Sequence, residues 1–191
     1  TVAATAPTGY EGQLWLDSTD GSMYVYYTDP GGGSSSWIGA VSRSGGILQV
    51  AQATKVDVVS TTSTSFIDTT GMSIDITPRS TSSKIMVMVQ LSHSNSSGST
   101  DHSFNLVRNS TNLLQSTGGS LGNSTMSPAT IPTTLNIINS AIMFLDSPST
   151  TSTVTYKIQW RTGAGTLYLN RRGVGGSYGS TSTITVMEVA G

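Results

Sequence analysis

The sequence contains two histidines, and they lie close together along the chain. His93 and His102 flank the segment Ser94–Asp101, so Asp101 directly precedes the second histidine. If the strands on either side pair as a hairpin, the two rings meet at its base, where imidazole and carboxylate suit a metal or an organic ligand. Solvent-exposed histidines at the base of a loop are the alternative. We include His93 and His102 among the ligand-binding candidates and expect neither a bound metal nor a cofactor.

Patterns that would indicate catalysis are weak. Serine is abundant, so a Ser-His-Asp set can be written in many ways, yet the sequence lacks the G-x-S-x-G pattern of a nucleophile elbow. The acidic residues are scattered singly, whereas a glycosidase needs two carboxyl groups roughly 5–10 Å apart. Single acids beside serine and threonine are more typical of turn caps. The sequence therefore predicts a protein that is not an enzyme, with a glycan-degrading enzyme as the alternative from another class.

Arginines and aromatic residues gather in the last part of the chain, at Trp160, Tyr168, Arg171, Arg172 and Tyr178. A sugar ring packs its C–H face on an aromatic plane while polar neighbours bond its hydroxyl groups, so these residues are candidates for glycan contact. The alternative is that Trp160 and Tyr168 alternate into a core while the arginines solvate a loop. Aromatic rings beside arginine also suit single-stranded nucleic acid. A net charge of −1 gives no general basic surface, so we expect no nucleic-acid partner.

The composition predicts an all-β scaffold for these residues. Serine and threonine make up about a third of the 191 residues and only 10% are charged, against a usual ~25%. Low net charge argues against disorder, and threonine, valine, isoleucine and tyrosine suit strands. Uncharged strands do little to prevent edge pairing, so we expect copies of the chain to associate. No apolar run predicts membrane insertion, and without cysteine no disulfide holds the fold.

The first part of the chain has a pattern of its own. Thr1–Gly9 is small and polar, which indicates a tail, and a start at Thr1 without methionine indicates a processed or truncated chain. A small aromatic meander follows, with a turn at Asp20-Gly21. Its predicted strands are Gln13–Asp17, Met23–Tyr27 and Trp37-Ile38. Together with the Ser/Gly linker that follows, residues 1–46 are predicted to form an N-terminal attachment segment.

Residues 47–191 predict a jelly-roll-like β-sandwich. Short β-prone runs are separated by Gly, Pro, Asn and Ser clusters, and about eight of them fit a sandwich. The predicted strands are Ile47–Ser60, Phe66–Asp68, Ser73–Thr77, Lys84–Ser92, His102–Arg108, Leu135–Asp146, Thr153–Trp160, Thr166–Asn170 and Ser182–Val189. One apolar face of Ile85–Leu91 is expected to pack against other copies in a homotrimer.

Several segments resemble modules of tailed-phage virion proteins. Pro7–Gly39, PTGYEGQLWLDSTDGSMYVYYTDPGGGSSSWIG, is similar to a short module of tail-fibre and other phage structural proteins through G-x-LW-x-D, G-x-x-YVYY-x-D and S-x-W-I. The rest resembles a phage virion C-terminal domain. The matching segments are GGILQV at Gly45–Val50, STTSTSFIDTTGMSIDITP at Ser60–Pro78, SKIMVMV at Ser83–Val89, LDSPSTTSTVTYKIQ at Leu145–Gln159 and STITVMEVAG at Ser182–Gly191.

This resemblance implies a domain on the exterior of the virion, commonly trimeric. A tail-fibre or spike tip would bind other virion proteins through residues 1–46 and a host-surface glycan through its loops. The expected contact loops are His93–His102, Ser116–Thr134 and Arg171–Ser180. The alternative is a capsid decoration or head-fibre protein that binds capsomers. The absence of heptads and of repeated shaft segments favours that alternative.

Overall fold

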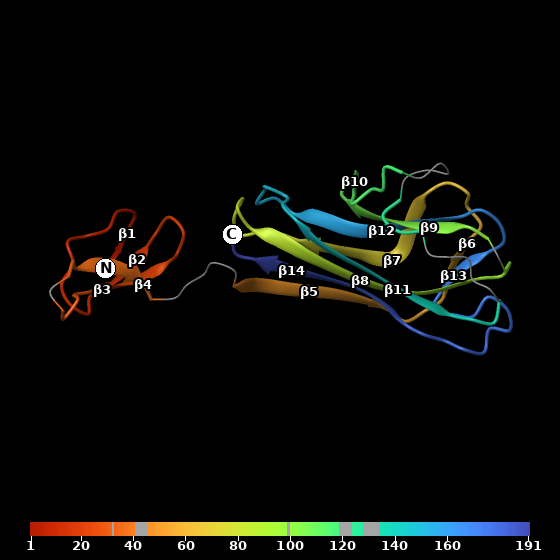
Figure 1. The fold of residues 1–191 in the computed structure, drawn as a ribbon, viewed down its shortest axis with the longest axis horizontal. Helices are drawn as coiled ribbons and strands as arrows, with labels where there is room; N and C mark the ends of the chain where they lie inside the picture. Colours follow the sequence, from red (N-terminus) through yellow and green to blue (C-terminus); the bar gives the residue numbers. More distant parts are fainter. Residues whose placement is uncertain (32, 41–45, 99, 119–123, 128–133) are drawn as a thin grey trace. The chain divides into compact units, whose positions relative to one another are not determined.

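The computed structural model describes residues 1–191 except 32, 41–45, 99, 119–123 and 128–133. The described residues form two compact units, Thr1–Gly46 and Ile47–Gly191 (Figure 1). Their regular elements are all strands, which confirms the all-β fold class. In this described part of the chain no helix has the length and apolarity needed to cross a bilayer.

The first unit is a four-stranded sheet that packs around aromatic rings. Its strands are, in spatial order, β1 (Val2–Ala3), β2 (Leu14–Asp17), β3 (Met23–Tyr27) and β4 (Ser36–Gly39). The Trp15 ring is buried, with its centroid 4.8 Å from that of Tyr24 and 5.7 Å from that of Trp37. β1 lies where the sequence predicts a tail. It pairs there because the Trp15 indole donates a hydrogen bond to the Ala3 carbonyl at 3.0 Å, which satisfies a buried donor.

The second unit is a sandwich of two sheets. One sheet has the order β10 (Thr111–Leu113), β9 (His102–Arg108), β12 (Val154–Thr162) and β7 (Ile67–Ile76). The other has the order β5 (Ile47–Lys55), β14 (Ser182–Val189), β8 (Lys84–Asn95), β13 (Leu167–Leu169) and β6 (Val59–Thr61), and β11 (Ile138–Asp146) also pairs with β8. Figure 1 shows the two sheets facing each other.

The core lies between these two sheets and corrects one prediction. Alternate residues of β12 point inward, among them Tyr156 and Trp160, both nearly inaccessible to solvent. The apolar side chains of Ile85–Leu91 on β8, expected to join copies of the chain, point inward as well and are at most 3% exposed. That face is covered by the chain's own second sheet, so it is not available to another copy.

Two of the differences from the predicted strands change how the chain is divided. The run Ile47–Ser60 is split into β5 and β6, because the side chain of Asn170 donates to the carbonyls of Lys55 and Asp57 at 2.8 and 3.0 Å and replaces the ladder there. The segments predicted as two strands at 66–68 and 73–77 are joined in β7. The join accommodates a register shift opposite β12, and Gly71 in it has a φ of +78°, a conformation that glycine adopts readily.

Candidate functional site

The two histidines meet inside the sandwich, not at the base of a hairpin. His93 is on β8 and His102 on β9, and these strands belong to different sheets. Their rings project from facing sheets, with centroids 4.8 Å apart and with His102 Nε2 3.1 Å from His93 Nδ1. They are 0% and 2% exposed. The alternative of solvent-exposed histidines is therefore wrong, because alternation directs both side chains into the core.

A chain of hydrogen bonds runs through this pair. His93 Nε2 is 2.9 Å from Ser140 Oγ, and His102 Nδ1 is 3.4 Å from the Thr100 carbonyl. Since a carbonyl only accepts, we assign the proton of His102 to Nδ1. His93 Nδ1 then donates to His102, and Ser140 donates to His93.

In this order of donors, Ser140 stands in the place of a nucleophile, His93 in that of a base and His102 in that of an orienting group. Burial, with a smaller effect of His102, lowers the pKa of His93 to about 3, so this imidazole is a weak base near neutral pH. Ser140 pairs with the core residue Leu91 and shares its inward face. The arrangement serves to link the two sheets.

Three acidic side chains each form an ion pair with a different basic residue. Asp146 bonds Arg108, Asp68 bonds Lys157 and Asp57 bonds Lys55. For Asp57 and Asp68 the hydrogen bond from the lysine is the largest cause that lowers the carboxyl pKa. Within the described ranges, no three His, Cys, Asp or Glu residues are placed to share a metal ion.

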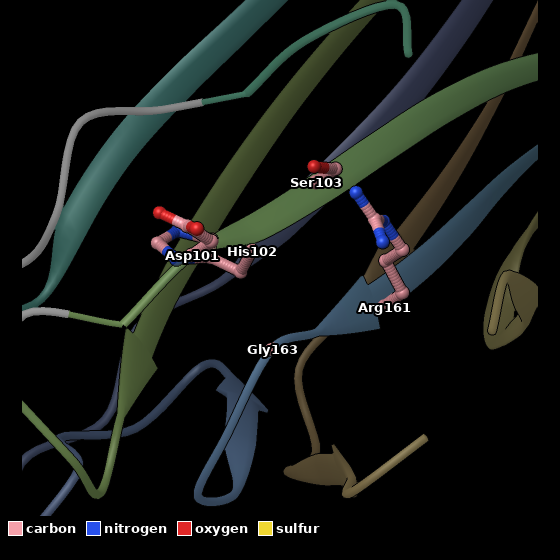
Figure 2. A pocket seen from close by; sticks show the side chains of 5 residues that line it. All are labelled: Asp101, His102, Ser103, Arg161 and Gly163. Atoms are coloured by element: carbon pink, nitrogen blue, oxygen red, sulfur yellow. The ribbon is translucent and has the colours of Figure 1, made fainter. Parts of the chain in front are cut away.

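A shallow hollow lies at the end of β9 and β12. Figure 2 shows the residues that line it, Asp101, His102, Ser103, Arg161 and Gly163. His102 is directed toward His93, whereas the Ser103 hydroxyl bonds the Ser127 hydroxyl at 2.9 Å. Neighbouring residues of a strand project to opposite faces, so this serine and this histidine do not form a nucleophile–base pair.

The remaining candidates form what we call the arginine–tyrosine loop, residues Tyr168–Ser180. The Arg171 guanidinium lies 4.3 Å from the centre of the Tyr168 ring, and the Arg172 guanidinium lies 4.3 Å from that of Tyr178. Tyr178 is 61% exposed. Trp160 takes no part, because it is 1% exposed and fills the core, as the core alternative predicts. Tyr168 does not fill the core as that alternative predicts. Its backbone pairs with Ser94 on β8, and its ring stacks on the Arg171 guanidinium.

The base of this loop is anchored to the end of β8. Ser94 Oγ donates to the Arg171 carbonyl at 2.5 Å, and an isolated bridge joins Arg171 to Gly179. A Cβ at Gly173 would collide with the Asn95 carbonyl. The loop therefore presents its rings and guanidinium groups from a fixed base.

Replacing Gly173 by alanine should displace this base. We expect Gly173→Ala to lower the free energy of unfolding by about 1–3 kcal/mol, the usual cost of forcing extra volume into a packed site, measured by urea denaturation. Gly118→Ala is the control, because a Cβ there meets no atom of the described residues within 4 Å. Equal stability of the two variants would contradict the close contact.

Sequence reasoning missed Ser140 as a partner of His93. It lies 47 residues away along the chain, and only the pairing of β11 with β8 brings the two together. No local pattern signals such a contact. Of the predicted contact loop Ser116–Thr134, residues 119–123 and 128–133 lie outside the described part of the chain.

Comparison with known proteins gives a likeness to solved structures. No protein-family model matches the chain, and no curated protein matches it in sequence. Among solved structures, the VP2 subviral particle of infectious bursal disease virus is similar at 15% sequence identity and a TM-score of 0.39. The match covers 97% of this chain and 45% of that one, so the chain spans less than half the length of that protein. The class defined by the coordinates is an all-β chain of two units, the second a β-sandwich.

Proposed function

We propose that this chain is a non-enzymatic structural protein on the exterior of a phage virion, and that the arginine–tyrosine loop contacts a glycan of the host surface. The observation that carries the glycan contact is the pair of guanidinium groups stacked on Tyr168 and Tyr178 at one end of the sandwich. The virion setting is supported by the resemblance of the Trp- and Tyr-rich N-terminal segment and of the strand segments to phage modules. A tail-fibre or spike tip is the form we favour.

The loop chemistry suits a sugar. Exposed Tyr178 offers an aromatic plane on which C–H groups pack. The guanidinium groups of Arg171 and Arg172 belong to none of the ion pairs seen among the described residues. Arg171 donates to one backbone carbonyl and Arg172 to two, and a guanidinium has five N–H donors, so each group retains donors for a ligand. From Ser147 to Met187 the chain contains no Asp or Glu, which favours glycans that carry carboxylate, sulfate or phosphate groups.

The arginine–tyrosine loop lies far from the residue at which the second unit begins. Strand β5 begins at Ile47, directly after that unit, and ends at Lys55, which pairs with Ser182 beyond the arginine–tyrosine loop. At 3.3 Å per residue the strand is about 30 Å long. Ile47 and the arginine–tyrosine loop therefore lie at opposite ends of the sandwich, which supports a contact tip at the end away from Ile47.

Removal of the exposed ring tests this function. We expect Tyr178→Ala to weaken binding to its best ligand on an array of bacterial surface polysaccharides by at least about tenfold, or 1.4 kcal/mol, because the stacking plane is lost. The matched control is Tyr10→Ala, which removes a tyrosine that is 71% exposed in the other unit. Absence of wild-type binding to any polysaccharide, or equal binding by both variants, would refute the glycan contact.

A capsid decoration protein is the second candidate. It is favoured by the compact aromatic core of the first unit, because a folded module of this kind is suited to clamp neighbouring capsomers. Labelling of intact particles with an antibody against the chain distinguishes the two forms: label on the head supports decoration, and label at the tail tip supports the fibre.

A further inference from the structure

The outer face of the larger sheet carries a band of apolar side chains. We call this the outer apolar face and define it by Val50, Met86, Met88, Met143, Leu145 and Met187. The register places Val50 beside Met187, Met187 beside Met86, and Met86 beside Leu145, so one row crosses β5, β14, β8 and β11. A second row runs through Met88 and Met143. On β8, Met86 and Met88 alternate with the buried residues, so they point away from the core.

This face is exposed in the single chain. Met143 is 67%, Val50 56% and Leu145 43% accessible to solvent. The other residues of the two rows are the uncharged Gln52 and Thr185. A face that water covers normally alternates polar and charged groups outward, and large exposed apolar patches mark interaction sites.

The opposite face of the sandwich is built differently. The outward positions of β7 and β12 there include Asp68, Asp75, Lys157 and Arg161. Asp68 and Lys157 form an ion pair at 2.7 Å that is open to solvent. The two rows of the outer apolar face carry no charge, and Lys84 at the start of β8 stands in the next row. The chain thus gathers charges on one outer face of the sandwich and leaves the centre of the other apolar, which indicates that this centre is covered.

The face continues onto an open sheet edge. Within the described residues β11 pairs with β8 alone, so the other side of Ile138–Asp146 offers free backbone groups. From Asn139 to Leu145 this edge has neither a charged residue nor a proline, the devices that usually prevent an edge from pairing with another chain.

We infer that a second copy of this chain covers the outer apolar face and the adjoining β11 edge. The two apolar rows carry no charge, so they meet the same rows of another copy without like-charge repulsion. Strands β14 and β8 pair over seven residues, from Lys84 to Gln90, a stretch that contains both rows. Four strands about 4.8 Å apart and about seven residues of 3.3 Å each span about 440 Å² per copy. Two such faces come to about 900 Å², and the β11 edge brings the total toward the ~1,200 Å² at which specific interfaces begin.

This assignment replaces the face of Ile85–Leu91 predicted for the homotrimer by the alternate face of the same strand. It does not depend on the proposed glycan contact. A failure of self-association would leave that contact unaffected, and loss of glycan binding in Tyr178→Ala would leave the interface unaffected.

The molar mass of the full 191-residue chain tests the inference. We expect sedimentation equilibrium between about 1 and 100 µM to show an oligomer, which Met143→Lys weakens at least about tenfold because a buried, unpaired ammonium is costly. Thr70→Lys is the matched control, since it places the same charge at an exposed position of β7 in the other sheet. A monomeric wild type, as expected if another virion protein covers the face, or equal weakening by both variants would overturn the inference.

Cysteine cross-linking gives a second readout that does not require a new charge to be tolerated. The chain contains no cysteine, so a single introduced thiol can link only to another copy. We expect Met143→Cys to form covalent dimers under mild oxidation much faster than Thr70→Cys. Equal rates for the two variants would place the contact elsewhere and overturn the inference.

Discussion

Acidification from pH 7 to pH 4 is expected to lower the free energy of unfolding by about 3 kcal/mol through His93 alone. Desolvation by burial, with a smaller effect of His102, lowers the pKa of His93 to about 3, whereas in the unfolded chain it titrates near 6.5. Between these values the unfolded state binds the proton and the folded state does not. Stability is therefore complete above pH 6.5 and is lost as the pH falls through this window. Urea denaturation at a series of pH values measures it.

Other ionisable groups near the pair or elsewhere in the chain contribute to the same profile, and a lowered pKa of His102 adds to the loss on acidification. His102 also has a lowered pKa, chiefly because of burial, while the Thr100 carbonyl and Asp101 act in the opposite direction. His93 also contacts the neutral Phe104 and Ser140. Asp57, Asp68 and Glu188 have lowered pKa values, so their contribution is lost only below about pH 4.5, the upper limit of carboxylate titration in the unfolded chain.

The variant that isolates the effect is His93→Gln. Its amide retains a donor and an acceptor for Ser140 and His102 but does not titrate. We expect this variant to be less stable than the wild type at pH 7 and to lose less stability between pH 6.5 and 4.5. A wild-type profile that is flat over that interval would show that the pair is accessible to protons in the folded state.

Most strands could be predicted because their signals are local. Alternation of apolar and polar residues marked His102–Arg108 and Ser182–Val189 with the bounds that the structure has. The turn at Asp20-Gly21 was equally clear, since its Asp20 side chain accepts from the backbone of Ser22 and Gly21 has a φ of +70°. These features depend on a few consecutive residues, and tertiary packing had no reason to alter them.

The sequence did not predict which face of a strand points into the core. Both faces of β8 are apolar, with Ile85 and Val87 on one side and Met86 and Met88 on the other. Alternation separates these sets but does not say which one faces the second sheet. The branched residues form the core and the methionines lie outside, so the face predicted to join copies of the chain is the buried one.

The positions of the candidate site residues also depend on the order of the strands in the two sheets. Proximity of the two histidines was expected from a hairpin, but it results from two strands in facing sheets. The contact between Tyr168 and Arg171 spans three residues, so it was open to sequence reasoning. Burial of Trp160 was weighed as an alternative and could be decided only by the pairing of β12 between β9 and β7.

Removal of the Asp146 carboxylate should have the largest effect of any single substitution proposed for this chain. One of its oxygens, Oδ2, accepts hydrogen bonds from Arg108 Nη1 and from the Tyr156 hydroxyl, both at 2.6 Å. Burial, reinforced by the Asp146 carboxylate, raises the pKa of Tyr156, so its hydroxyl remains a donor. We expect Asp146→Ala to lower the free energy of unfolding by about 3–5 kcal/mol, because it leaves a buried hydroxyl and a largely buried guanidinium without their acceptor.

The chain offers a matched comparison for this effect. Asp68 also pairs with a basic residue on a strand, Lys157 at 2.7 Å, but its side chain is 56% exposed against 8% for Asp146. Solvent and salt screen such a pair, so Asp68→Ala should cost less than about 1 kcal/mol. Urea denaturation at pH 7 in low and high salt separates the two cases. If both variants lose the same stability, or if salt removes the loss in Asp146→Ala, then water reaches the Asp146 carboxylate and this end of the sandwich is not closed.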